Sequence, residues 1–458
     1  MARSCHHCDE FSRAALVRRS AAEAGRGLPA IETGMPLPAG TGLDRRTFVT
    51  RSFGLALSVY GLGKLGLFEE GIARAASGPA QPVLVSVFLP GGTDSLSVLY
   101  PGLDSTYRRL RPQLKLDPAA GQAFSEDNRL FWHPKLSPLA TLHGEGKVTV
   151  APAVGYTHPD QSHFTSRHFW EVGATDPGLM SGWMGRYLDR SGNMDNPLQG
   201  LSLDYQLQPS LASAKVPVAS LAAPDEYTFD APGVWGQVED RMLETLAPLG
   251  ARRSDRFLNQ AAGATAASDR LRRQLAPFAQ NSGNGYGSPV AYPDVDDSFP
   301  HQLAGLAAMI AAGLPLRCVA ITAPGEYDTH DDQPQALADG LDVTARSLYS
   351  FQRDLEARGL ADRVLVLVWS EFGRRAEENG SSGTDHGAAG TAFLIGTRAK
   401  GQMIGEFPGV DNLDDDGNLK ATSDFRGIYS SLLEQWLSTD AAAVIPGAGS
   451  FARTPLLK

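Results

Sequence analysis

Carboxylates, histidines and a serine recur at a few places along this chain of 458 residues. Side chains of these types bind divalent cations, transfer protons or attack esters. Carboxylate oxygens suit zinc, manganese, calcium and magnesium, and imidazole nitrogens suit zinc and manganese. Together they predict a metal or catalytic site. The set comprises Asp94, Ser162, His163, Asp328, His330, Glu371, Asp385 and His386.

The elements that must position these residues alternate along the chain. Unbroken apolar runs rich in valine and leucine predict strands that are buried on both faces of a sheet. Amphipathic patterns between them predict helices. Strands that alternate with helices predict an α/β fold with a central, mostly parallel sheet flanked by helices. The strands are expected at 83–89, 148–154, 316–322, 364–369 and 391–395, and the helices at 254–280, 302–312, 335–358 and 427–437.

Each group of candidate residues follows, or closely precedes, one of these strands. In open α/β sheets, ligands bind outside the carboxyl ends of the strands. We therefore expect residues that are far apart in sequence to meet at that edge. For any single carboxylate, the alternative is a solvated loop charge or a helix cap.

Ser162 precedes an apolar and aromatic helical pattern that includes His163 and Phe164. A hydroxyl at a helix N-terminus lies at the positive end of the helix dipole. This position suits a metal-activated nucleophile that attacks a phosphate or sulfate ester, with His163 beside it. The alternative is that Ser162 is only the N-cap of the helix.

The first 76 residues predict an export signal. Arg45-Arg46 precedes an apolar stretch at 53–62, and Ala73-Arg74-Ala75 resembles a cleavage site,. The arginine pair predicts a twin-arginine signal peptide at 43–76, recognised by the twin-arginine export machinery. An uncleaved, membrane-associated helix is the alternative. Residues 1–42 form a leader that we expect to be disordered. In this leader, Cys5 and Cys8 are weak evidence for a zinc site, and Met35 is a second candidate for the first residue of the protein,.

The remainder, 77–458, is predicted to be a single domain with no stable membrane span after cleavage. The whole chain has a net charge of −10. Residues 1–76 hold 10 basic and 7 acidic residues, so their removal leaves 31 basic and 44 acidic residues and a net charge of −13. This acidic balance argues against nucleic acid as a partner, because phosphate contacts need a basic face. Only Cys318 would remain, which excludes an internal disulfide.

Several motifs together resemble a secreted bacterial family, domain-of-unknown-function family 1501. The resemblance covers about 83–437 and implies a fold similar to the alkaline phosphatase and sulfatase superfamily. That superfamily has a three-layer sandwich, with its site at the strand ends. The motifs are Phe88-Leu89-Pro90-Gly91-Gly92-Thr93-Asp94, Ser162-His163-Phe164, Ser181-Gly182-Trp183-Met184-Gly185-Arg186-Tyr187, Tyr327-Asp328-Thr329-His330, Ser370-Glu371-Phe372-Gly373-Arg374, Gly383-Thr384-Asp385-His386-Gly387 and Asp424-Phe425-Arg426.

The resemblance also implies roles for individual residues. Asp94 resembles the metal-binding Asp after the first strand, and Ser162 the nucleophile. Asp328 and His330 resemble the Asp/His pair of one metal, and His386, next to Asp385, the late metal-binding His.

The second metal is less well matched. Glu371 stands where the superfamily often has the Asp of an Asp-His pair, but Phe372 follows it instead of His. The implied cofactor is therefore a divalent metal (zinc, manganese or calcium), as one or two ions. Arg374 and Arg426 are candidates to bind a small anionic ester.

The predicted function is that of an exported, metal-dependent hydrolase of phosphate or sulfate esters, located in the periplasm, the cell envelope or outside the cell. The alternative is a non-catalytic envelope or extracellular binding protein on a hydrolase-like fold with a degenerate metal site. The hydrolase and the binding protein are distinguished by whether five residues converge within metal-bonding reach: Asp94, Asp328, His330, Glu371 and His386. A further acidic pattern at 412–417 matches the opening of a calcium loop but lacks its twelfth-position Glu, which favours a β-turn,.

Overall fold

The apolar runs form the centre of the protein. The computed structural model describes residues 59–60, 81–193, 196–225, 241, 245, 271, 275–278 and 282–458. All of these lie in one compact unit, Pro38–Lys458. The predicted leader, the predicted signal peptide apart from 59–60, and most of the helix predicted at 254–280 lie outside the described residues.

A mixed sheet runs through the described part of the chain. Its strand order is β1-β8-β7-β9-β2-β10-β13-β6-β14. The block from β8 to β10 is parallel, β13 is antiparallel to both its neighbours, and β1 is antiparallel at one edge. The predicted mostly parallel sheet is therefore confirmed. The strands are β1 (Val59–Tyr60), β2 (Val83–Phe88), β6 (Val148–Gly155), β7 (Gly200–Leu203), β8 (Val218–Ser220), β9 (Cys318–Thr322), β10 (Val364–Trp369), β13 (Gly390–Ile395) and β14 (Ser423–Asp424).

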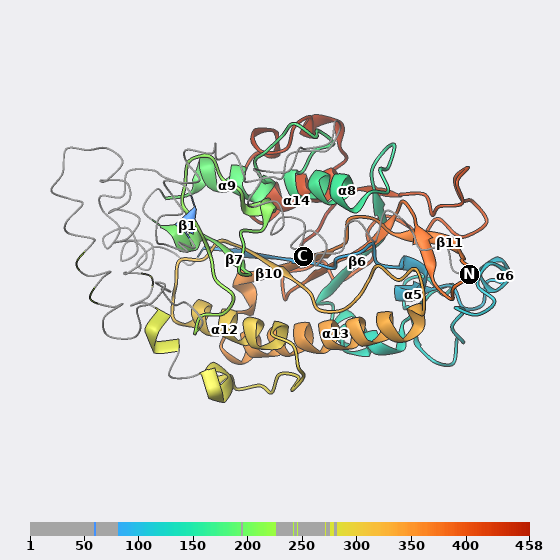
Figure 1. Ribbon diagram of the computed structural model, residues 1–458, viewed down its shortest axis with the longest axis horizontal. Coiled ribbons are helices and arrows are strands. Elements are labelled where there is room, and N and C mark those ends of the chain that lie inside the picture. Colours follow the sequence, from blue (N-terminus) through green and yellow to red (C-terminus); the bar gives the residue numbers. More distant parts are fainter. Residues whose placement is uncertain are drawn as a thin grey trace, which may run out of the picture. The chain divides into compact units, whose positions relative to one another are not determined.

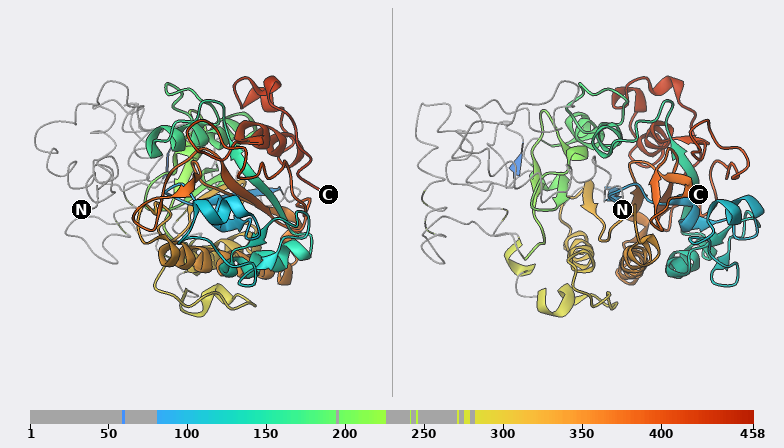
Figure 2. Two further views of the ribbon diagram at one scale, coloured as in Figure 1. Left: turned by 90° about the vertical axis from the view of Figure 1, so that its right-hand side faces the viewer. Right: turned by 45° about the vertical axis from the view of Figure 1, so that its right-hand side comes forward.

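Helices cover both faces of this sheet, as Figures 1 and 2 show. The lower layer of Figure 1 holds α12 (Phe299–Ala311) and α13 (Gln333–Ala357), with α7 (Ser137–Gly144) packed against α13. The upper layer holds α8 (His163–Val172), α9 (Trp183–Ser191) and α14 (Phe425–Gln435). The described chain is thus a three-layer α/β structure.

The two helical layers explain why the strand sequences are continuously apolar. Successive side chains of a strand point to opposite faces of the sheet. In β2, Val83, Val85 and Val87 enter the hydrophobic core that includes α12 and α13. Leu84 and Phe88 enter the core that includes α8, α9 and α14. A strand covered on both sides therefore has no solvent-facing position for a polar residue.

Short elements at the carboxyl edge of the sheet complete the framework of the site. After β10, the hairpin of β11 (Arg374–Glu378) and β12 (Thr384–His386) carries the chain out and back before β13 begins. After β2, the chain forms α5 (Ser95–Val98), β3 (Leu99–Tyr100) and α6 (Ser105–Leu110). A small antiparallel sheet joins β3 to β5 (Phe131–Trp132) and β4 (Gln122–Ala123).

The segment at 412–417 adopts a turn. Asp414 Oδ1 accepts hydrogen bonds from the backbone N–H groups of Asp416 and Asn418, at 3.0 and 2.7 Å. Gly417 has φ +79°, which glycine adopts without strain,. The acidic side chains of this segment therefore order their own backbone, as the turn interpretation predicted.

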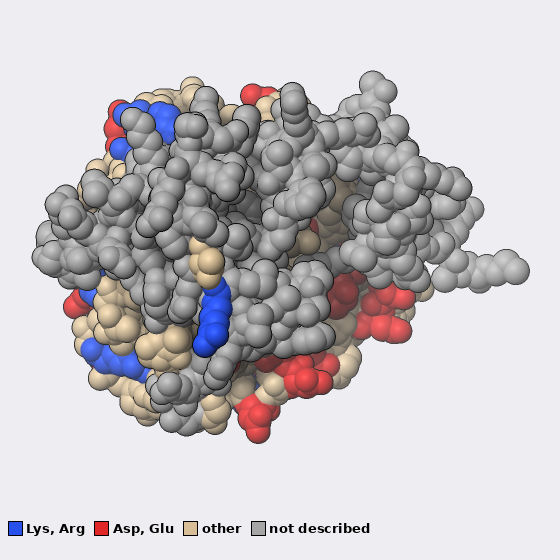
Figure 3. Space-filling model, turned by 60° about the vertical axis from the view of Figure 1, so that its left-hand side comes forward, with Lys and Arg blue, Asp and Glu red and all other residues tan. Residues whose placement is uncertain are grey.

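The described surface is unevenly charged. On the face drawn in Figure 3, acidic side chains gather at the lower right and basic ones towards the left. A search of the described helices finds none with both the length and the apolar character that a bilayer crossing requires.

Candidate functional site

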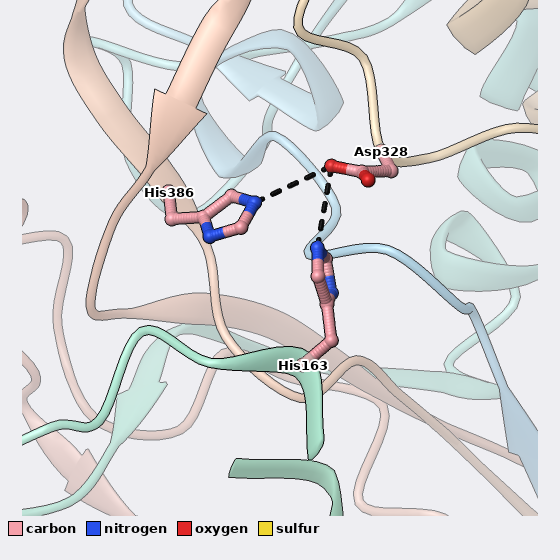
Figure 4. A group of neighbouring side chains, drawn as sticks. All are labelled: His163, Asp328 and His386. Atoms are coloured by element: carbon pink, nitrogen blue, oxygen red, sulfur yellow. Dashed lines mark hydrogen bonds and ion pairs between the residues drawn. The ribbon is translucent and has the colours of Figure 1, made fainter. Parts of the chain in front are cut away.

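Three histidines surround one carboxylate at the carboxyl edge of the sheet. Asp328 Oδ1 lies 3.3 Å from His163 Nε2, 3.1 Å from His330 Nε2 and 3.4 Å from His386 Nε2. Figure 4 shows the side chains of His163 and His386 pointing at Asp328. The four side chains are 15–25% exposed, so solvent reaches the cluster. We call these four residues the histidine cluster.

The cluster is assembled from three separate segments. Asp328 and His330 lie on the loop after β9, and His163 is the first residue of α8, which follows β6. His386 is the last residue of β12. The cluster thus brings together residues up to 223 positions apart, from β9 and β6, which are not adjacent in the sheet, and from the separate β11-β12 hairpin. The sequence pattern could predict this meeting only in general terms.

Each histidine is oriented through its second ring nitrogen. His163 Nδ1 donates to Glu371 Oε1 at 2.8 Å, and His386 Nδ1 donates to the Gln161 carbonyl at 2.7 Å. His330 Nδ1 lies 3.3 Å from Asp385 Oδ1. In a neutral imidazole, a protonated Nδ1 leaves a lone pair on Nε2. Each Nε2 atom therefore faces the cluster, where it donates to Asp328 Oδ1 when it is protonated and offers a lone pair to a metal when it is not, as metal-ligating histidines do.

The spacing of these atoms fits a divalent cation. The ligand atoms of His163, Asp328 and His386 all lie within 4.8 Å of one another. A tetrahedral zinc with bonds of about 2.0–2.1 Å separates its ligand atoms by about 3.3–3.4 Å. His330 Nε2 and His386 Nε2 are 2.8 Å apart. This is a hydrogen-bond distance and is shorter than the separation of two ligands of one zinc ion, so the candidate ligands are His163, Asp328 and His386,.

Asp328 is the charged centre of the cluster. Burial by itself raises the pKa of this carboxyl group. The imidazoles of His163, His330 and His386 and the guanidinium of Arg374 more than offset that effect and hold the pKa far below its ordinary value,. Asp328 therefore remains a carboxylate. Its two oxygens offer about four lone-pair sites, so Arg374 leaves room for a cation.

Glu371 supports the cluster from behind. Its Oε1 accepts from the Gly91 N–H at 3.0 Å as well as from His163, and its Oε2 accepts from the Gly92 N–H at 3.1 Å and from Ser370 Oγ at 3.0 Å. Burial raises the pKa of Glu371, but the bonds from His163 and the Gly91 amide bring it below its ordinary value. Glu371, which was predicted as a metal ligand, thus contacts the cluster through His163.

Phe372 explains part of the packing around the rings. Its ring centroid lies 4.9 Å from the centroids of both His163 and His386. Gly92 must lack a side chain here, because a Cβ at that position would lie 2.2 Å from the Phe372 ring. The aromatic residue that replaces the expected histidine therefore acts as a wall for the two rings.

Arg374 is buried and donates hydrogen bonds to three segments of the chain. Its side chain is fully buried, and Nε and Nη1 donate to the carbonyls of Gly92 and Thr384 at 2.7 and 2.8 Å. Nη2 donates to the Gly91 carbonyl and, at 2.6 Å, to Asp328 Oδ1. The guanidinium predicted to bind an anionic ester is thus used by the protein itself.

Asp94 lies in a separate buried network. Its carboxylate is fully buried and pairs with Arg111, with Oδ1 2.8 Å from Nη2 and Oδ2 2.5 Å from Nη1. It also accepts from Ser97 Oγ at 2.6 Å and from Gln333 Nε2 at 2.7 Å. Although burial raises the pKa of Asp94, the ion pair with Arg111 lowers it below its ordinary value. None of these contacts is with the histidine cluster.

The remaining predicted residues lie around this centre. Ser162 occupies the N-cap position of α8, but its hydroxyl makes no capping hydrogen bond. Asp385 is mostly exposed and contacts His330. Arg426 is paired with Asp424, at 2.7 Å between Nη2 and Oδ2, and stacks on the Phe451 ring. Of the five residues expected to converge, Asp328, His330 and His386 do, Glu371 contacts them through His163, and Asp94 bonds elsewhere.

Arg167 was missed by the sequence analysis. It lies one helical turn after His163, and 36% of its side chain is exposed. Its Nε donates to Glu171 Oε1 at 2.7 Å, and its guanidinium stacks 4.6 Å from the centroid of Phe88, the last residue of β2. The i,i+4 spacing from His163 was the available signal, because such residues share a helix face.

The comparisons with known proteins agree with the predicted family. Residues 251–422 match the family model described as "Protein of unknown function (DUF1501)". No curated protein sequence matches the chain.

The solved structures that match this chain are distant from it. The crystal structure of Ps i-CgsB in complex with k-i-k-neocarrahexaose is 10% identical with a TM-score of 0.37, covering 81% of this chain and 75% of that one. A protein in the alkaline phosphatase superfamily from Vibrio parahaemolyticus is 9% identical with a TM-score of 0.32, covering 85% and 78%. The PsFucS1 sulfatase from Pseudoalteromonas sp. is 12% identical with a TM-score of 0.33, covering 85% and 76%. Similarities this distant transfer neither a substrate nor a reaction.

Proposed function

We propose that this protein is a divalent-metal-dependent hydrolase of phosphate or sulfate esters. One observation carries the proposal. Three imidazole Nε2 atoms converge on Asp328 Oδ1, and the Nδ1 atom of each ring bonds to a carboxylate or a carbonyl. This is the outer-shell pattern of metal-binding histidines.

His163, Asp328 and His386 would hold the metal, with His330 hydrogen-bonded beside them. A set of two nitrogens and one oxygen suits zinc or manganese better than calcium, which takes six to eight oxygens,. When bound, such a cation polarises an ester oxygen and lowers the pKa of water. Glu371 keeps His163 in the tautomer that presents a lone pair, and Phe372 fixes the planes of two rings.

Ser162 is the proposed nucleophile. It directly precedes the cluster residue His163 and lies at the N-terminus of α8, where the helix dipole stabilises negative charge,. Its backbone N–H donates to Asp160 Oδ1 at 2.8 Å, and its hydroxyl takes no part in capping. A hydroxyl that is not needed as a cap supports the catalytic interpretation over the structural one.

Arg167 is the proposed contact for the anionic group of the substrate. Arg167 bonds to Glu171 and to Gln208, but 36% of its side chain is exposed on the same helix as His163, against 12% for Arg426 and none for Arg374. Its pair with Glu171 and its stacking on Phe88 hold the guanidinium in one position. A guanidinium held this way suits the oxygens of a phosphate or sulfate group.

The proposed location follows from the sequence. The Arg45-Arg46 pair and the apolar stretch after it support export by the twin-arginine route to the periplasm, the cell envelope or beyond,. That route would also fit a protein that folds and takes up its metal before export.

A second candidate function is binding without catalysis. The observation in its favour is that Arg111 pairs with Asp94, and that Glu371 bonds to backbone N–H groups and His163. Fewer carboxylates then remain for a second ion. A single metal held by the histidine cluster could bind an anionic ligand without turnover.

The test measures metal content and turnover in the same samples. Purified protein is loaded with zinc or manganese, dialysed, analysed by mass spectrometry for metal, and assayed on aryl phosphates and aryl sulfates. We expect about one ion per chain, lost in the variants D328N and H386A and retained in the matched control H301A, whose histidine bonds to Tyr286. A folded wild type that takes up no metal would contradict the proposal, and metal uptake without turnover would favour the binding protein.

A further inference from the structure

The buried amide of Gln333 joins the two segments that carry most of the histidine cluster. Its side chain, at the start of α13, is almost fully buried. Gln333 Oε1 accepts from Thr329 Oγ1 at 2.9 Å and from Thr384 Oγ1 at 2.6 Å. Gln333 Nε2 donates to Asp94 Oδ2 at 2.7 Å and to Ser97 Oγ at 3.4 Å. The amide thus uses both donors and both acceptor sites.

The chemistry of the partners determines which way this amide points. The Asp94 carboxylate only accepts hydrogen bonds, so the NH₂ group must face it. The carbonyl oxygen then faces the hydroxyls of Thr329 and Thr384. If the amide were reversed, its oxygen would face the Asp94 carboxylate and its NH₂ group would face the threonine hydroxyls. Two buried acceptors would then face each other, so the hydrogen bonds to Asp94 exclude this orientation.

The two threonines are next to the cluster residues. Thr329 lies between Asp328 and His330, and Thr384 lies two residues before His386 on β12. The Thr384 N–H donates to the Thr329 carbonyl at 3.0 Å, so the two segments also touch through their backbones. A hydrogen bond from each threonine to the same oxygen of Gln333 sets the distance between the segments.

The NH₂ group of the Gln333 amide bonds to Asp94, which is itself held in place. Asp94 is held by Arg111, and Arg111 in turn donates to the carbonyls of Ala376 and Arg375, both at 2.9 Å. These carbonyls belong to β11, the partner strand of β12. The network therefore reaches the segment of His386 from two sides, through Gln333 and through the hairpin.

We propose that Gln333 is a positioning residue for the metal site: it holds the segment of Asp328 and His330 at the correct distance from His386. This inference rests on the proposed metal-binding function. Gln333 contacts none of the four residues of the histidine cluster, so it acts only through Thr329 and Thr384. In this network Asp94 anchors the amide of Gln333.

The test compares two glutamines of the same helix. Gln352 is also buried on α13, and its amide bonds to Glu356 Oε1 at 2.7 Å and Thr397 Oγ1 at 3.2 Å, away from the cluster. The variants Q333M and Q352M keep similar volume and lose the amide. Zinc and manganese dissociation constants are measured by competition with a chromophoric chelator, and thermal unfolding of the metal-free proteins is followed by circular dichroism.

We expect Q333M to weaken metal binding by at least about tenfold, as changes outside the ligand shell commonly do. Q352M should bind metal like the wild type, even if both variants lose similar thermal stability. Equal dissociation constants in Q333M and wild type, or equal weakening in Q352M, would overturn the inference. A wild type that binds neither metal would overturn the proposed function and this inference with it.

Discussion

Glu371 should control metal affinity although it is not a ligand. The variant E371Q replaces a carboxylate that only accepts hydrogen bonds by an amide with one acceptor and one donor group. In the wild type, the carboxylate accepts from His163 Nδ1 and from the N–H groups of Gly91 and Gly92. One glutamine oxygen cannot serve both sides of the site.

The size of the effect follows from the two possible orientations of the amide. If its oxygen faces Gly91 and Gly92, its NH₂ group faces His163 Nδ1, and the ring proton must move to Nε2, which removes the lone pair that a metal needs. If its oxygen faces His163, it still accepts from Gly91, but the buried Gly92 N–H loses its acceptor and faces the NH₂ group, at about 1–3 kcal/mol,. The first orientation leaves no backbone N–H unpaired, because an oxygen at the Oε2 position accepts from both Gly91 and Gly92. It is therefore the expected one, and it predicts metal binding weaker by roughly tenfold to a hundredfold, or about 1.4–2.7 kcal/mol.

The assay is the chelator competition described for Gln333. The matched control is E378Q, because Glu378 also accepts from two backbone N–H groups, of Gln113 and Leu114, but contacts no histidine. We expect E378Q to bind zinc like the wild type. An E371Q protein that is folded, as judged by its circular dichroism, and binds zinc with unchanged affinity would refute the reasoning.

Three other predictions concern stability and reactivity. R111M should lower the free energy of unfolding in urea by about 3–5 kcal/mol, because it leaves the buried Asp94 carboxylate unpaired, and the double variant with D94N should recover part of the loss,. If R111M alone matches the wild type, the buried pair is not stabilising. Burial lowers the pKa of His133 to about 4, from an ordinary value of 6.5. At a pH below 6.5, the unfolded chain therefore binds a proton that the folded chain excludes. The wild type should therefore lose about 2 kcal/mol of stability between pH 7 and pH 5 that H133N does not lose, as measured by urea unfolding at both pH values. Burial raises the pKa of Cys318 to about 12, so iodoacetamide should modify this thiol only in unfolding urea, and mass spectrometry of the native protein should find it unmodified,.

The sequence alone predicted the long strands and the edge of the sheet at which the site lies. The strands β2 and β10 were predicted within one residue because a strand covered on both faces is almost entirely apolar, and that pattern is visible in a single sequence,. The short strands β7 and β8 were not predicted, since three or four residues carry too little pattern,. The antiparallel direction of β13 was likewise hidden, because direction depends on the path of the connecting hairpin.

Which of the acidic residues would face the histidines was decided only by the tertiary structure. Residue type placed Asp94, Asp328 and Glu371 equally well after their strands, because each is a carboxylate at a strand end. Their roles differ because Arg111 pairs with Asp94, and because the Gly91 and Gly92 N–H groups bond to Glu371. These partners come from other segments, and which carboxylate each one reaches depends on the packing of the whole sheet. The sequence determined which side chains gather at the carboxyl edge, and the fold determined that Asp328 is the one the histidines surround.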